Sequence, residues 1–259
     1  MKLTACYRAA AFALFLMWCG ASSVHAQGSI VQPRENAPYT PGQGGDPRIY
    51  STPMPTRPYD TPPARLSAVK SSGEAVKMGD TLRQAGPLNY QRAFSWYTYA
   101  LKLDAKDARA HYGLGELYRA FNDHDKAEKA YEQALALKPQ MVEAHIGLGR
   151  EYSAQKLYDK AIQSFQQALT LMPKSLEAQL AIGDCYFVQK KYTEAVAAYQ
   201  KTIELKSKSL EAHYNLGMTY LLMNNRAAAV EQGRIVRSID KVAGANFESV
   251  IKRFDAQHN

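Results

Sequence analysis

The chain has 259 residues, of which 46% are hydrophobic and 22% charged, and its formal charge at pH 7 is +8. Its length allows a substantial core, and its composition gives no sign of a membrane or collagen-like class. The basic residues are interleaved with acidic ones, as in Asp125-Lys126-Ala127-Glu128-Lys129, and no run of five basic residues occurs. This pattern favours a solvated mixed-charge surface over the clustered basic stripe of a nucleic-acid-binding protein.

The first 26 residues have the order of a secretory signal peptide. Lys2 and Arg8 are followed by the apolar run 9–18, and Val24 and Ala26 stand at the positions that a signal peptidase reads. We therefore expect cleavage after Ala26 and a periplasmic or secreted protein of the bacterial envelope. The alternative is a membrane anchor, but the apolar run is too short, since crossing the hydrocarbon layer takes roughly 20 apolar residues.

Cys19 raises a second alternative, which is a lipid anchor. Bacterial lipoprotein signals resemble Leu-small-small-Cys, whereas Cys19 follows Met17 and the bulky Trp18, so the sequence disfavours lipid attachment. Removal of the leader also removes Cys6 and leaves Cys185 as the only cysteine of the mature chain. We expect a fold without an intramolecular disulfide.

Residues 27–70 form a proline-rich segment. Nine of the chain's twelve prolines lie between residues 27 and 65, together with few aliphatic side chains. Such a segment buries too little apolar surface to offset the entropy of ordering, so we expect a disordered linker. It is either a plain spacer or a docking arm, because Tyr39, Tyr50 and Tyr59 stand among the prolines.

A 34-residue repeat governs the rest of the chain. Glycine recurs at this step, and so do an alanine, an aromatic and an aliphatic position. The four sets are Gly115, Gly149, Gly183 and Gly217; Ala127, Ala161, Ala195 and Ala229; Tyr118, Tyr152, Tyr186 and Tyr220; and Leu114, Leu148, Ile182 and Leu216. This period, with small residues at fixed offsets, predicts paired antiparallel helices stacked in an array. We expect the glycines and alanines where helix backbones approach most closely.

Four segments in register resemble the tetratricopeptide-repeat (TPR) family. The segment 212–220 matches that family's first helix, and the segments 127–137 and 161–171, followed by Pro139 and Pro173, match its second helix. The predicted fold is all-α, a right-handed α-solenoid of about five TPR motifs in residues 71–243. The first motif is degenerate and fits when Met78 and Gly79 take the Leu-Gly positions. In residues 244–259 an amphipathic stretch predicts a C-terminal capping helix that covers the apolar end of the last repeat.

No pattern in the sequence indicates catalysis, a metal site or a cofactor, so we expect a protein that is not an enzyme. His111, His145 and His213 share one repeat position, but equal positions on packed neighbouring helices lie roughly 8 to 10 Å apart, too far to share an ion. We expect packing or surface histidines. Cys185 stands beside the tyrosine row and is expected to be a buried, inert thiol.

The resemblance implies a concave groove lined by the first helix of each pair. If family geometry holds, the predicted peptide-binding residues are Tyr112, Glu116, Arg119, Ile146, Arg150, Leu180, Asp184, Tyr214, Asn215 and Met218. Such a groove suits an extended or helical peptide with hydrophobic anchors. The lysines with which chaperone-binding relatives grip a terminal carboxylate are replaced by Tyr112 and Ile146. The alternative is that Leu180, Phe187 and Leu221 belong to the core.

The sequence therefore predicts a scaffold or adaptor that binds a protein or peptide segment and helps to assemble an envelope complex, such as a pilus, secretion or wall-synthesis machine. The layout of signal and repeats resembles bacterial pilus-assembly and secretion accessory proteins. The alternative is a periplasmic holdase, a chaperone that shields apolar segments of exported proteins.

Overall fold

The computed structural model describes residues 69–258, and every regular element in that range is helical. The elements in chain order are α3 (Ser72–Gln84), the 3-10 turn η2 (Pro87–Asn89), α4 (Tyr90–Leu103), α5 (Ala108–Ala120), α6 (His124–Leu137), α7 (Val142–Ala154), α8 (Tyr158–Leu171), α9 (Leu176–Val188), α10 (Tyr192–Leu205), α11 (Leu210–Leu222), α12 (Arg226–Ile239) and α13 (Lys241–His258). The predicted signal peptide, Cys19 and residues 27–68 of the predicted linker lie outside the described residues.

Side chains in the loops start most of the helices. The Asp107 carboxylate accepts from two free backbone amides at the start of α5, and the hydroxyls of Ser175 and Ser209 each accept from one amide at the start of α9 and α11. Asp123 and Asn225 cap the second helices α6 and α12. The second helices α6 and α8 end two residues before proline, which cannot continue the helical hydrogen bonds.

The loops inside the last four pairs share one backbone conformation. One residue per loop lies in the left-handed region, at Asn122, Lys156, Lys190 and Asn224, each 34 residues after the last. Only glycine adopts this conformation without strain, although asparagine tolerates it well. The backbone conformation at this position therefore repeats even though the side chain does not.

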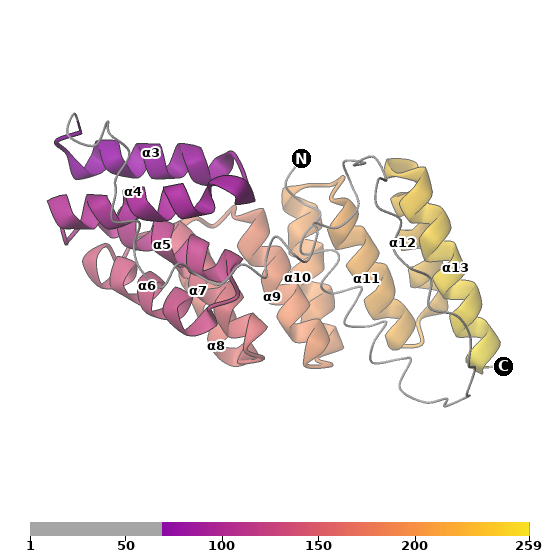
Figure 1. Cartoon of the computed structure of the whole chain (residues 1–259). Helices are drawn as coiled ribbons and strands as arrows, with labels where there is room; N and C mark the ends of the chain where they lie inside the picture. The colour runs from indigo at the N-terminus through magenta and orange to yellow at the C-terminus, as the bar shows by residue number, and fades with distance from the viewer. Residues whose placement is uncertain (1–68, 259) are drawn as a thin grey trace, which may run out of the picture. The chain divides into compact units, whose positions relative to one another are not determined.

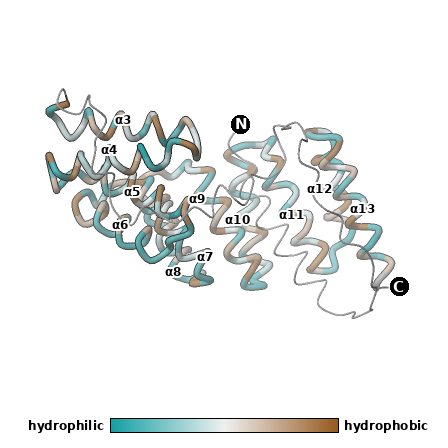
Figure 2. Tube along the Cα trace, viewed as in Figure 1, coloured by the Kyte–Doolittle hydropathy of each residue, from teal (hydrophilic) through white to brown (hydrophobic). Residues whose placement is uncertain are grey.

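The helices form five pairs that pack in chain order, from α3 with α4 to α11 with α12 (Figure 1). Each second helix also packs against the first helix of the next pair, so the apolar stripes that one pair exposes are covered by its neighbour. Figure 2 shows hydrophobic residues at intervals along the helices rather than in one block, as amphipathic helices require. The described residues thus form an α-solenoid.

Four aromatic rings in the second helices hold neighbouring pairs together. Tyr97, Tyr131, Phe165 and Tyr199 are 34 residues apart and at most 1% exposed. A Cβ atom on Gly115 or Gly147 would lie 2.7 or 2.6 Å from the Tyr131 ring, so the ring lies between two glycines from successive first helices. The repeated glycines therefore make room for an aromatic ring, and not for a neighbouring backbone as the sequence analysis assumed.

The capping helix α13 begins at Lys241, three residues before the predicted start at 244. The Asp240 carboxylate accepts from the amides of Val242 and Ala243, each at 2.8 Å, and fixes the earlier start. Phe247 of α13 is fully buried, and a Cβ on Gly217 or Gly233 would lie 2.5 or 2.8 Å from its ring. The capping helix thus supplies the aromatic ring that α12 lacks.

Within residues 69–258, no helix is both long and apolar enough to cross a bilayer.

Candidate functional site

The first helices of the five pairs, α3, α5, α7, α9 and α11, form a surface that we call the first-helix face. Beyond their packing within pairs, α3 contacts α5, α5 contacts α7, and α9 contacts α11. These contacts form two runs of neighbouring first helices, α3–α5–α7 and α9–α11, whose side chains we treat together as the first-helix face.

Eight of the ten predicted groove residues keep partial solvent exposure on this face. They are Tyr112, Arg119, Arg150, Leu180, Asp184, Tyr214, Asn215 and Met218. Ile146 and Glu116 are buried, at 6% and 8% exposed. Ile146 packs with Ile162 and Phe165 and belongs to the core, so it is not available to a guest. The sequence left open whether Leu180, Phe187 and Leu221 line the groove or belong to the core. Leu221 belongs to the core, since it is 1% exposed.

Glu116 is the centre of a charged cluster at the amino-terminal part of the face. Its carboxylate accepts from the Tyr131 hydroxyl at 2.6 Å and from the Arg119 guanidinium at 3.1 Å, and Arg83 of α3 lies 3.6 Å away. Burial alone would raise the pKa of Glu116, but the Arg119 guanidinium and the Tyr131 hydroxyl outweigh it and hold the pKa below its usual value. Glu116 therefore positions the two arginines and does not itself reach a guest.

The same arrangement recurs in α3, at residues that the sequence analysis did not single out. The Tyr97 hydroxyl donates to Asp80 at 2.7 Å, and Arg83 donates to the Tyr97 hydroxyl at 3.2 Å. When Met78 and Gly79 take the Leu-Gly positions, Asp80 aligns with Glu116 and Arg83 with Arg119. The two-residue shift of the first repeat was the signal that could have found them.

Asp184 of α9 occupies the equivalent position but has only neutral partners. Its Oδ1 accepts from the Tyr199 hydroxyl at 2.8 Å and from the Asn215 amide at 2.9 Å. No cationic side chain in the range 69–258 comes within 4.0 Å of its carboxylate. Burial raises the pKa of Asp184 to about 6, against the opposing effect of the two donors.

In the third pair the tyrosine and the acid are both absent. There the ring is Phe165, which has no hydroxyl, and the residue equivalent to Glu116 is Arg150. Arg150 turns to Glu177 and forms an ion pair with it. An acid thus stands on the first helix wherever the second helix offers a tyrosine hydroxyl, at Asp80, Glu116 and Asp184.

The three repeated histidines brace loops. His111, His145 and His213 each place Nε2 against the carbonyl oxygen six residues earlier, at 3.1, 2.8 and 2.9 Å. Within the described residues, no group of three or more histidine, cysteine or acidic side chains is arranged to hold a metal. Cys185 is 3% exposed, and burial raises the pKa of its thiol to about 11, as expected for an unreactive thiol.

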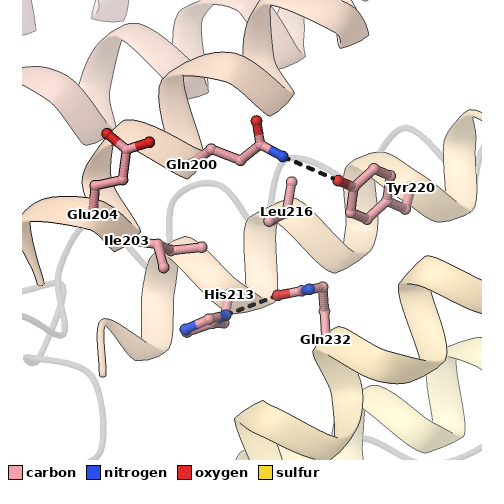
Figure 3. A pocket seen from close by; sticks show the side chains of 7 residues that line it. All are labelled: Gln200, Ile203, Glu204, His213, Leu216, Tyr220 and Gln232. Atoms are coloured by element: carbon pink, nitrogen blue, oxygen red, sulfur yellow. Dashed lines mark hydrogen bonds between the residues drawn. The ribbon is translucent and has the colours of Figure 1, made fainter. Parts of the chain in front are cut away.

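An open hollow of about 480 Å³ lies between α10, α11 and α12 (Figure 3). Ile203 and Leu216 supply apolar surface to it, and Gln200, Glu204, Tyr220, His213 and Gln232 supply polar groups. Two of its contacts are internal, because His213 bonds to Gln232 at 2.8 Å and Gln200 donates to Tyr220 at 3.5 Å. No sequence pattern indicated this hollow.

Family models match several parts of this helical region. Tetratricopeptide-repeat models match residues 108–141 and 152–197, and a TPR-repeat model matches residues 183–224. A search of curated protein sequences found no match.

Solved structures with a similar fold include three chains at low sequence identity. YrrB, described as a TPR protein with an unusual peptide-binding site, is 23% identical, with 73% of this chain and 100% of that chain covered and a TM-score of 0.59. PilF of Pseudomonas aeruginosa is 19% identical, with 70% and 90% covered and a TM-score of 0.60. MamA of Desulfovibrio magneticus is 17% identical, with 66% and 96% covered and a TM-score of 0.60. These likenesses establish the fold.

Proposed function

We propose that this chain, which carries tetratricopeptide repeats, is an interaction scaffold that binds a segment of another protein on its first-helix face, which we take as the concave side of the solenoid. The guest is an extended or helical segment with apolar anchors. The role is one of binding and not of catalysis, in keeping with the general use of the TPR fold. YrrB, which has a similar fold, is described as having a peptide-binding site.

The observation that carries this proposal is the row of partly exposed side chains on the first-helix face. Contacts join α3, α5 and α7, and separately α9 and α11, and the exposed side chains include Tyr112, Leu180 and Met218. The guanidinium-bearing side chains of Arg119 and Arg150 are partly exposed and supply charged groups to the same face. Apolar anchors and a few fixed polar groups are what peptide recognition uses.

We also place this activity in the bacterial envelope. The support is the leader pattern of residues 1–26, which predicts export and cleavage after Ala26. PilF of Pseudomonas aeruginosa shares the fold but is only 19% identical, so it supports the solenoid and not a pilus role. The mass of the chain isolated from the periplasm tests the location, because a chain that keeps residues 1–26 or carries an acyl group on Cys19 would contradict it.

Replacement of apolar side chains tests the face itself. Leu180→Ser and Met218→Ser, made together, should weaken binding of the partner recovered from envelope extract at least tenfold with helicity preserved. The matched control is Leu171→Ser with Leu205→Ser. These leucines end second helices at 38% and 39% exposed, and their replacement should leave affinity unchanged. Equal losses of affinity in both variants would show that the partner does not bind specifically to the first-helix face.

The number of partners separates an adaptor from a holdase. An adaptor should co-purify with one or two defined proteins, whereas a holdase should suppress aggregation of unrelated unfolded proteins. A chain that suppresses aggregation of several unrelated substrates and enriches no defined partner would replace the adaptor role with a chaperone role.

A further inference from the structure

Three carboxylates on the first-helix face accept a tyrosine hydroxyl, and they differ in their charge balance. Asp80 lies 3.6 Å from Arg83, and Glu116 lies 3.1 Å from Arg119. In both cases the arginine comes three residues after the acid on the same helix, which places the two side chains on one side of that helix. The chain itself therefore neutralises these two acids.

Asp184 lacks such a neighbour because Phe187 occupies the position three residues later. Its two donors, the Tyr199 hydroxyl and the Asn215 amide, are neutral. The other titratable group beside it is the buried thiol of Cys185, which carries no positive charge. A carboxylate held among neutral groups retains an unbalanced negative charge at neutral pH, and a cation placed against it gains strongly from the weak solvent screening.

The surroundings of Asp184 are apolar and partly accessible. Leu180 and Phe187 lie one turn before and one turn after it on α9, and both pack partly buried against the cluster that contains Tyr199. On α11, Met218 follows Asn215 by three residues and is also partly exposed. Asp184 itself keeps partial contact with solvent. A single negatively charged carboxylate is thus surrounded by apolar side chains.

We propose that Asp184 is the binding site for a lysine or arginine side chain of the guest, whose neighbouring apolar residues lie against Leu180, Phe187 and Met218. This inference rests on the proposed function and adds the chemistry of the guest. The aliphatic stem of a basic side chain packs on the apolar surface while its charged end meets the carboxylate. The hydrogen bonds from Tyr199 and Asn215 fix the carboxylate in advance of binding, which lowers the entropic cost of recognition.

Selection from a peptide library tests this site. Random twelve-residue peptides displayed on phage are panned against the immobilised full chain, and the enriched sequences are compared between variants. We expect the wild-type chain to enrich peptides with one lysine or arginine flanked by apolar residues. Asp184→Asn retains an oxygen that accepts from Tyr199 and Asn215 but removes the charge, and it should abolish the basic preference and keep the apolar one.

A second variant tests the charge without removing the carboxylate. Phe187→Arg places an arginine where Arg83 and Arg119 stand relative to their own acids, so Asp184 becomes neutralised internally and the basic preference should disappear. The matched control is Asp80→Asn, at the equivalent position of the first pair, which should leave the preference intact. Circular dichroism checks that each variant keeps its helicity.

Affinity of the enriched peptide gives the size of the effect. Replacement of its basic residue by norleucine should weaken binding to the wild-type chain at least tenfold, and should change binding to Asp184→Asn less than twofold. Peptides enriched without a basic position, or a basic preference unchanged in Asp184→Asn, would overturn the inference and leave the scaffold role standing. If the wild-type chain enriches no peptide beyond those enriched by the Leu180→Ser, Met218→Ser double variant, the proposed function fails as well.

Discussion

The two ends of the first-helix face follow one design with different charges. In α3 and α5 an acid accepts a tyrosine hydroxyl and an arginine lies beside it, whereas in α9 the acid Asp184 has the same hydroxyl bond and no arginine. The bond between tyrosine and acid joins the two helices of a pair, so it belongs to the fold. The residue three positions later sets the charge balance of the acid, and our proposal assigns that position to recognition of the guest.

The last pair departs further from the design and gives the largest predicted effect. Phe247→Ala removes the ring that lies between Gly217 and Gly233, where the other pairs use a ring of their own second helix. Loss of a fully buried phenylalanine typically costs about 3 to 5 kcal/mol. Hydrogen exchange should show this loss in α11 to α13. Exchange rates that change equally in α3 to α6 would contradict local stabilisation of the carboxyl-terminal end.

Neutralisation of the two kinds of acid should change the free energy of unfolding differently, with a loss at Glu116 and no loss at Asp184. Glu116→Gln leaves Arg119 and Arg83 without their shared carboxylate, and we expect a loss of about 2 kcal/mol in the free energy of unfolding. Asp184→Asn removes no ion pair and keeps an acceptor for both donors, so stability at pH 7.5 should stay the same or rise slightly. Urea denaturation of the two variants measures the difference. A similar loss in both would show that Asp184 has a cationic partner.

The pH dependence of stability sharpens the same contrast. The pKa of Asp184 is raised to about 6 in the folded chain, so the folded state binds a proton there more tightly than the unfolded state does. Its contribution to stability therefore grows as the pH falls from 7 towards 4, and is lost as the pH rises through 6. We expect wild type to gain about 2 kcal/mol relative to Asp184→Asn between pH 7.5 and 4.5. A constant difference across this range would contradict the burial of this carboxylate.

The smallest predicted effect is in the third pair, where the tyrosine and the acid can be introduced one after the other. Phe165→Tyr adds a hydroxyl near Arg150, which cannot accept a hydrogen bond, and we expect a loss of about 1 kcal/mol. Adding Arg150→Glu supplies the acceptor that the other pairs have and should recover most of that loss. A double variant less stable than Phe165→Tyr alone would show that the pairing of tyrosine and acid is not transferable between pairs.

The sequence predicted the fold because each helix pair repeats the same contacts at a 34-residue step. A buried ring such as Tyr131 and the glycines beside it, Gly115 and Gly147, recur in register, so the pattern of spacing carries the packing. Phe247 lies outside the repeats. The amphipathic pattern of residues 244–259 predicted that this segment caps the last repeat, but not that the Phe247 ring fills the space at Gly217 and Gly233.

The candidate site was less accessible to sequence reasoning. Repeat position identified the helix face, but it did not show that the Tyr131 hydroxyl and Arg119 would cover Glu116, or that Ile146 would pack on Phe165. The Tyr131 hydroxyl and the Phe165 ring come from neighbouring helices, whose placement the repeat position alone does not give. Asp80 was missed because the longer loop of the first pair shifts it by two residues from the common register.

Site-specific crosslinking in the living cell tests the central claim most directly. A photoreactive benzoylphenylalanine is placed at Leu180 or Met218 on the first-helix face, or at Leu171 or Leu205 at the ends of second helices, and crosslinked proteins are identified by mass spectrometry. The account predicts that one or two defined proteins are captured from the first-helix positions and not from the other two. Capture of the same proteins from Leu171 and Leu205, with none from Leu180 and Met218, would contradict it.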